Sequence, residues 1–310
     1  MSDLKQLKIT RGDATAFFHG SWYRGPNTNF IPAKADLAKP GAIKHHVLTG
    51  WAPEAPFISK TDRITSFGSC FARHVTAFLD NNGFNVFFNK GNVEQSHIIR
   101  FGEGIVNTFA VRQQFEWGFG VKDFPDNLWF GPNKEIAKPT EEQRKQTNYI
   151  LNNTDIFIIT LGLSEIWYDK QSGEAFWRAI PADMFDETRH GFRISTVEEN
   201  KANLCVIRDL IRQYRPDASV VLTLSPVPLM ATFRPVSCVT ASSVSKSILR
   251  VAIDEFMRDL RTDDLTYYFP SYEIVKDVYP DPFKEDNRHP KDPIIQNIMR
   301  VFYNNFCIKE

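Results

Sequence analysis

Residues 64–75 read ITSFGSCFARHV, and this segment is the clearest indication of the fold. Residues 63–67 form a short apolar run that predicts a buried strand. Residues 71–82 have helical spacing and stop before Gly83, which suits the residue just beyond a helix end. Only a tight turn separates the two elements. Ser69 and Cys70 are therefore expected at the carboxyl end of a strand and facing a helix N-terminus, as in a nucleophile elbow.

The alternation of strands and helices continues toward the C-terminus. Apolar strands are expected at 84–89, 155–162, 219–227 and 265–275, and helices at 108–119, 197–214, 243–261 and 292–306. Short apolar strands alternating with longer helices predict an α/β fold with a doubly wound parallel sheet of about five strands and helices on both faces. Residues 167–179 are expected to form a hairpin insertion that overhangs the site.

Residues 1–60 differ from the rest of the chain. They contain five prolines and scattered glycines, with little sustained periodicity of either kind. We therefore expect an irregular N-terminal extension packing on the core over 1–60 and a single α/β domain over 61–310.

Composition narrows the class of partner. Lys+Arg and Asp+Glu both total 37, so the formal charge is zero and the basic footprint of a nucleic-acid-binding protein is missing. The first residues lack the apolar core of a signal peptide, and no later run approaches the ~18 apolar residues that would span a bilayer. The sequence predicts a cytoplasmic protein with a small-molecule or carbohydrate partner, no cofactor and no metal. It does not indicate an oligomeric state.

The four cysteines are far apart and predict neither a disulfide framework nor a zinc site. Cys205 and Cys307 are interpreted as structural, and Cys238 is assigned to a loop. Cys70 differs because the amide groups and dipole of a helix N-terminus would lower the pKa of its thiol and stabilise an oxyanion. The alternative is that Ser69 caps the helix and Cys70 packs beneath it.

A second candidate motif lies near the C-terminus, where KEDNRHPKD spans residues 284–292. Asp286 and His289 are three residues apart, so one helical turn would let the carboxylate orient the imidazole. The motif follows the last expected strand and precedes the last helix, which places it at the same sheet edge as Cys70. A solvated loop without catalytic function is the alternative.

Four motifs carry a family resemblance: FGSCFA (67–72), TLGLSEIW (160–167), LSPVPL (224–229) and DNRHP (286–290). Their order is that of GSCFA-domain proteins, which are distantly similar to SGNH hydrolases of flavodoxin-like fold, and the resemblance covers roughly residues 50–307. It implies that Cys70 is the nucleophile, with Ser69 as the alternative, and that Asp286 and His289 are the acid and base.

The same resemblance implies an oxyanion hole. Its donors would be the amides of Cys70 and Gly104 and the hydroxyl of Ser164, which stands where SGNH enzymes have an asparagine; Gly91 is the alternative glycine. The implied activity is that of an esterase or O-acyltransferase acting on an acyl, especially acetyl, ester of a carbohydrate or small metabolite. Acetyl-CoA is a possible donor for a transferase. The rival interpretation is an inactive carbohydrate- or protein-binding module on the same fold.

Three other residues are assigned structural roles. Trp167 and Trp177, in the expected hairpin, could stack on a sugar, but packing within the hairpin is favoured. His74, four residues after Cys70, is interpreted as a surface or partly buried histidine rather than a second base.

Overall fold

The structure, a computed structural model, describes residues 6–11, 14–19, 27–68, 70–87, 106–130, 139–177, 180–260 and 265–309. The chain divides into two compact units, Met1–Trp51 and Ala52–Glu310, so the boundary lies at residue 51 rather than 60.

The first unit begins with a hairpin. Strand β1 (Gln6–Arg11) pairs antiparallel with β2 (Ala14–His19), with Arg11 opposite Ala14, and two short helices follow, α1 (Lys34–Leu37) and α2 (Ala42–His46). The expectation of an irregular extension is thus wrong over the hairpin. Its connection, Gly12-Asp13, is a pair that favours two-residue turns.

The second unit contains a four-stranded parallel sheet in the order β3 (Ile64–Phe67), β4 (Ile156–Leu161), β7 (Ser219–Leu224) and β8 (Thr266–Phe269). Every residue of β4 and β7 is buried, as their continuous apolar runs predict for central parallel strands. The α/β class is confirmed.

The strand count is four rather than about five. The strand expected at 84–89 contributes one parallel bridge, from Val86 to Ile64, on the side of β3 away from β4. Residues 88 and 89 lie outside the described ranges. With Val86 in this position, the sheet keeps the strand order of a flavodoxin-like doubly wound fold.

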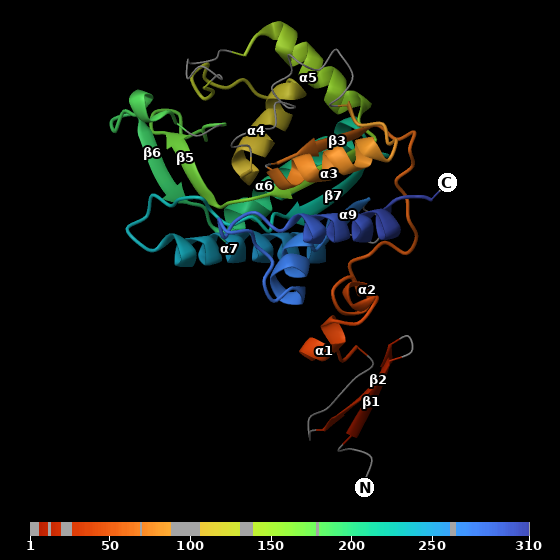
Figure 1. Cartoon of the computed structure of the whole chain (residues 1–310). Helices are drawn as coiled ribbons and strands as arrows, with labels where there is room; N and C mark the ends of the chain where they lie inside the picture. Colours follow the sequence, from red (N-terminus) through yellow and green to blue (C-terminus); the bar gives the residue numbers. More distant parts are fainter. Residues whose placement is uncertain are drawn as a thin grey trace. The chain divides into compact units, whose positions relative to one another are not determined.

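Helices flank the sheet in two groups (Figure 1). Helix α3 (Cys70–Asn81) lies beside α9 (Asp292–Phe306), and the rings of Phe78 and Tyr303 meet edge to face at 6.3 Å. Helix α4 (Thr108–Gly118) packs on α5 (Glu141–Asn153) and α6 (Val197–Tyr214), and α6 packs on α7 (Cys238–Asp259). Phe115 of α4 reaches Phe67 of β3 at 5.0 Å between ring centroids.

Two expected elements need correction. Strand β8 ends at Phe269 because Pro270 interrupts it, and the remainder of 265–275 forms α8 (Ser271–Glu273) and the start of a π-helical turn, η4 (Ile274–Val278). Helix α7 begins at Cys238, capped by the Ser237 hydroxyl, so this cysteine is not in a loop.

The hairpin expected at 167–179 forms over the described part of that range. Tyr168 bridges Ala175, and the amides of Phe176 and Asp169 donate to the carbonyls of Trp167 and Glu174. Strand β5 (Glu165–Asp169) also pairs antiparallel with β6 (His190–Ile194), which lies beyond the short helix η3 (Ala182–Met184). The insertion therefore extends to residue 194, beyond the range 167–179 that its turn residues predict. None of the helices in the described ranges combines the length and the hydropathy needed to cross a bilayer.

Candidate active site

The chain passes from the end of β3 at Phe67 to the start of α3 at Cys70 within a few residues, as an elbow between a strand and a helix requires. Gly68 follows β3 with a φ of 138°, a conformation that residues with a Cβ rarely adopt. A Cβ at this position would lie 2.7 Å from the Cβ of Thr160 and 2.8 Å from its carbonyl oxygen. Helix α3 begins at Cys70. The backbone therefore places residue 70 at a helix N-terminus directly beyond a central-sheet strand; Ser69 lies outside the described residues.

The Asp286–His289 pair is formed, but by a tight loop rather than a helical turn. Asp286 accepts hydrogen bonds from the amides of Arg288 and His289, at 3.0 Å each, and its other oxygen lies 2.5 Å from Nδ1 of His289. Asn287 adopts a left-handed φ of 52°, which lets the chain reverse within the loop.

These hydrogen bonds stabilise the ionised form of Asp286. The bond from the His289 ring and those from the two amides hold the pKa of Asp286 well below its usual range, so the carboxylate stays ionised. When Nδ1 donates to this carboxylate, Nε2 becomes the ring nitrogen that can accept a proton. Both side chains are accessible, His289 at 36% and Asp286 at 47%. The pair therefore has the form of a base with its orienting acid.

The charges of this loop act on His74 of α3, which is four residues after Cys70. Desolvation lowers the pKa of His74, the charges of Arg73, Lys284 and His289 lower it further, and Asp292 opposes them. The imidazole of His289 is therefore within electrostatic range of the helix that Cys70 begins.

The block after β4 is well ordered by hydrogen bonds, but Ser164 faces inward. Its side chain is fully buried, its hydroxyl lies 3.2 Å from that of Ser245 on α7, and its carbonyl accepts two bonds from Ser195. The expectation that Ser164 donates to an oxyanion is not supported by this geometry, because the hydroxyl has a protein partner and no open face.

The expected oxyanion glycines, Gly104 and Gly91, lie outside the described residues. The described chain resumes at Val106, whose carbonyl accepts the Gly162 amide at 2.7 Å. Val106 thus lies against the carboxyl end of β4.

The sequence model of the GSCFA family matches residues 63–302, most of the chain. The chain belongs to the GSCFA family. A search of curated proteins finds no match.

Among solved structures, the GSCFA chain is similar to carbohydrate esterases of family 3. One from Talaromyces cellulolyticus has 10% identity and a TM-score of 0.39 over 77% of this chain and 93% of that chain. One from Clostridium thermocellum has 10% identity and a TM-score of 0.37 over 79% and 94%. An acetyl esterase mutant with acetate ion has 10% identity and a TM-score of 0.38 over 77% and 93%. At this level the matches say nothing about what the GSCFA chain acts on.

One buried cation at this edge was missed from the sequence. Lys246 of α7 is only 3% exposed, and its ammonium donates to the carbonyls of Gly162 and Ser225, at 2.7 Å each. The signal was present: Lys246 occupies the apolar stripe of its helix, together with Leu249 and Ile253, where a lysine is unusual.

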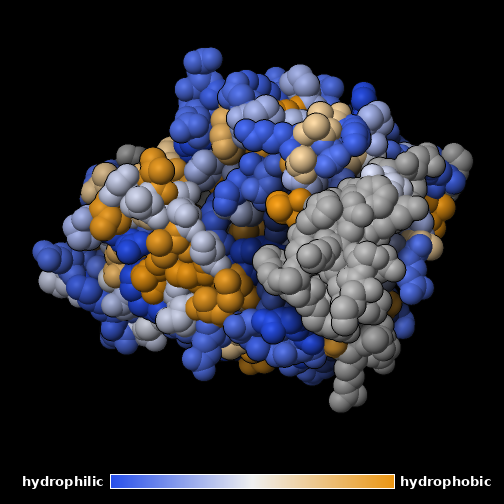
Figure 2. All heavy atoms as spheres, turned by 90° about the horizontal axis from the view of Figure 1, so that it is seen from below, coloured by the Kyte–Doolittle hydropathy of each residue, from blue (hydrophilic) through white to orange (hydrophobic). Residues whose placement is uncertain are grey.

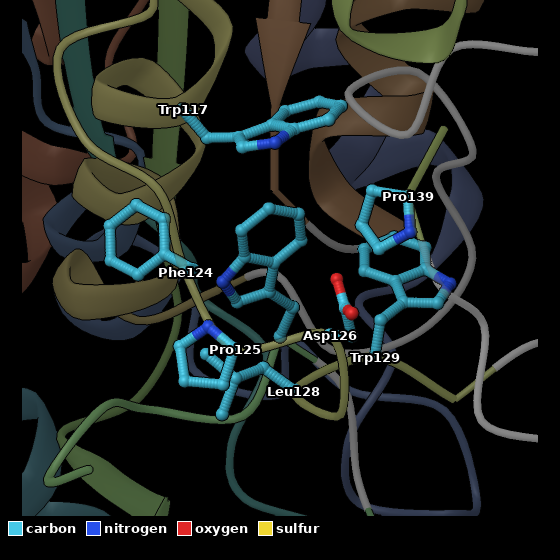
Figure 3. Close-up of a pocket in the computed structure, with 8 residues that line it drawn as sticks. Trp117, Phe124, Pro125, Asp126, Leu128, Trp129 and Pro139 are labelled. Carbon is cyan, nitrogen blue, oxygen red and sulfur yellow. The ribbon is translucent and has the colours of Figure 1, made fainter. Parts of the chain in front are cut away.

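The tryptophans of the GSCFA insertion pack within the protein. Trp177 is 2% exposed and meets the rings of Trp117 and Trp129 at 5.8 and 5.6 Å. The small pocket that Trp177 lines, shown in Figure 3, has about 30 Å³ of free space, enough for one or two waters and too little for a sugar ring. A stacking role for Trp177 is therefore not supported.

Trp167 is half-buried and contacts three rings, those of Phe185, Phe192 and Phe233. Phe185 and Phe233 remain 50% and 63% exposed. Figure 2, which shows the molecule from below, has apolar side chains gathered on one part of that face. The hairpin and the loop after β7 thus share one aromatic cluster.

Two other cysteines, Cys205 and Cys307, differ from a reactive thiol. Burial raises the pKa of Cys307 to about 12 and also raises that of Cys205. Within the described ranges, no group of three or more His, Cys, Asp or Glu side chains is placed to hold a metal ion.

Proposed function

We propose that this GSCFA protein is an esterase or O-acyltransferase of SGNH type that uses Cys70, His289 and Asp286. The observation that carries the proposal is the hydrogen-bonded Asp286–His289 pair, whose imidazole is within electrostatic range of α3. An ionised carboxylate that holds one ring nitrogen leaves the other to act as a general base, and a thiol at a helix N-terminus is the group best suited to lose its proton to that base.

The reaction follows from these roles. Nε2 of His289 takes the thiol proton as Cys70 attacks the acyl carbonyl, and the C–O bond of the ester breaks as the alkoxide receives that proton. The thioester that remains is attacked by water or by an acceptor hydroxyl, which His289 deprotonates in turn. The thiol is regenerated, and the products are an acid or a new ester. Backbone amides at the start of α3 are the expected donors to the oxyanion.

The proposed substrate is an acyl ester, especially an acetyl ester, of a carbohydrate or small metabolite. Hydrolysis and transfer use the same residues and differ only in whether water or an acceptor hydroxyl reaches the thioester. If transfer prevails, acetyl-CoA is the proposed donor.

One observation favours the rival, an inactive carbohydrate- or protein-binding module. Ser164 has no open face, so one expected oxyanion donor is absent from the block after β4. The two proposals differ in the reactivity of Cys70, because a binding module has no need of an ionised thiol.

The test is intact-protein mass after brief exposure to p-nitrophenyl acetate. Wild type should gain one acetyl group, Cys70→Ala should gain none, and Cys70→Ser should gain it slowly. Ser69→Ala should reduce acetylation less than either substitution of Cys70. Cys205→Ala, which removes a half-buried thiol on α6, is the matched control and should behave as wild type. An adduct that persists in Cys70→Ala and vanishes in Ser69→Ala would reassign the nucleophile; an adduct on neither residue favours the binding module.

If an adduct forms, a panel of acetyl-CoA and sugar acceptors then separates hydrolysis from transfer. Free acetate as the product supports a hydrolase, and an acetylated sugar supports a transferase.

A further inference from the structure

Lys246 joins the two central strands where they end. Gly162 directly follows β4 and Ser225 directly follows β7, and their carbonyls accept from the same ammonium group. The lysine reaches them from α7, which lies against β7. One side chain therefore fixes both strand ends at the edge where ligands bind in open α/β sheets.

The neighbouring residues of α7 hold the same two segments. The hydroxyl of Ser245 accepts the amide of Ser164 at 2.8 Å, and that of Ser242 accepts the amide of Leu229 at 3.2 Å. Together with Lys246, these serines form a polar stripe on the buried face of α7, and every hydrogen bond described here ends on backbone of the loops after β4 and β7.

A lysine is an expensive way to make these contacts. Enclosing an ammonium group without a counter-ion destabilises a fold, and an apolar side chain of similar volume would fill the same space without that cost. No charged side chain in the described part of the chain contributes to the pKa of Lys246, which burial alone lowers to about 7. Glu165, the nearest acid in sequence to Gly162, accepts from Thr232, and Arg250 of α7 pairs with Glu273.

Charge-assisted bonds explain the choice of residue. A protonated amine binds a carbonyl about twice as strongly as a neutral donor does. A fixed Gly162 carbonyl sets the plane of the peptide that follows, because that bond is planar, and so orients the block 162–165. The same holds for Ser225 and the loop after β7.

We propose that Lys246 is a positioning residue, whose ammonium group holds the ends of β4 and β7 in the arrangement that the candidate active site requires. It does not touch the substrate. This inference depends on the proposed function only where its test measures activity.

The charge of Lys246 gives the proposal a signature in pH. The pKa is lowered from 10.5 to about 7 in the folded protein, so the unfolded chain binds more protons between these values, and stability should rise with pH above 7. The two loops should become less well held over the same range, because the neutral amine forms weaker bonds. Opposite trends in overall stability and local protection distinguish positioning from general loosening.

The experiment measures hydrogen exchange by mass spectrometry in peptides covering 162–165 and 225–229, from pH 6 to 9, corrected for intrinsic exchange. In wild type, we expect protection to fall about tenfold above pH 7 while the melting temperature rises. Lys246→Met should show low protection at every pH. Lys201→Met, which removes a partly exposed lysine of α6 that pairs with Asp259 at the end of α7, should match wild type.

Turnover of p-nitrophenyl acetate is the second readout. Lys246→Met should lower kcat roughly 10- to 100-fold with KM changed less than about threefold, since misplaced groups affect the chemical step more than binding. Wild-type turnover should fall above pH 7 as Lys246 loses its proton, and the residual activity of Lys246→Met should lack this fall.

Protection that stays constant from pH 6 to 9 in wild type would overturn the inference, and that measurement needs no variant. Full turnover by Lys246→Met would overturn it as well. If wild type itself forms no acetyl adduct, the proposed function fails, while the exchange data still decide the role of Lys246.

Discussion

The two edges of the central sheet are held together in opposite ways. At the amino edge, Arg63 and Arg215 both bind the carboxylate of Asp155, at 2.7–2.9 Å. Arg63 precedes β3 and Asp155 precedes β4, so hydrogen-bonded ion pairs join the beginnings of the strands. Asn153 accepts another bond from Arg63.

The carboxyl edge contains features that cost stability. Gly68 has a φ that other residues avoid, Lys246 is a buried cation with no counter-ion among the described residues, and Asn287 has a left-handed backbone. Strained backbone and unpaired charge concentrate at functional sites because the rest of the fold can support them. The contrast therefore indicates that the amino edge serves stability and the carboxyl edge serves function. Substitutions at each edge test this contrast, and they are given in order of decreasing expected effect on stability.

Gly68→Ala should have the largest effect. The added methyl group would meet the Thr160 side chain at 2.7 Å and its carbonyl at 2.8 Å in a conformation that alanine disfavours. We expect a loss of about 3–5 kcal/mol in the free energy of unfolding, measured by urea titration, together with loss of acetyl-adduct formation. Gly173→Ala is the matched control, since this glycine also has positive φ but nothing within 4 Å, and it should cost roughly 1–2 kcal/mol and keep activity. Equal losses would mean that contact with β4 does not constrain the elbow.

Asp155→Ala tests the amino edge and should cost roughly 2 kcal/mol, because it leaves Arg63 and Arg215 without their carboxylate in a partly buried position. Activity per folded molecule should be unchanged. Burial opposes the shift, but hydrogen bonds from Arg63 lower the pKa of Asp155 from its usual 3.8, so this stabilisation exists above 3.8 and is lost as pH falls further.

Urea titrations between pH 2 and 7 check this pH dependence. The difference between wild type and Asp155→Ala should shrink toward acid. A constant difference, or a fall in turnover per folded molecule, would contradict the assignment of this edge to stability alone.

Much of the fold was predictable because its signals are local. The spans 197–214 and 292–306 match α6 and α9 to the residue, since an amphipathic stripe with a capping box in one, and an early proline in the other, define the ends of a helix. The errors occurred where a local pattern continued across a break, as at Pro270, or where pairing is distant in sequence, as between β5 and β6. The spacing of apolar residues predicts that a segment is a strand, but it does not indicate which other strand that segment pairs with.

The site was predictable only in part, for a related reason. The Asp286–His289 pair lies within one short motif, so its spacing was enough to suggest it. The inward orientation of Ser164 depends on Ser245, 81 residues away, and the role of Lys246 depends on two carbonyls in different loops. Contacts of this kind follow from the packing of α7, which a residue pattern does not contain.

Asp286→Asn should have the smallest effect on stability. It tests whether this loop of the carboxyl edge contributes to activity without contributing to stability. Asp286 is exposed, and an asparagine carbonyl oxygen can still accept from the amides of Arg288 and His289. The melting temperature should therefore stay close to that of wild type.

Activity should respond quite differently, because the asparagine NH₂ would face Nδ1 of His289 and favour the tautomer whose Nε2 carries the proton. That ring nitrogen could no longer accept a proton from Cys70. Turnover of p-nitrophenyl acetate should fall roughly 10²- to 10⁴-fold. His289→Ala should cost about as much, and the double variant little more, because the two residues act as a unit. Glu285→Gln removes the neighbouring exposed carboxylate and is the matched control for charge. Should Asp286→Asn and Glu285→Gln show equal turnover, the pair would be a feature of the loop alone, and the base that serves Cys70 would have to be sought elsewhere on this edge.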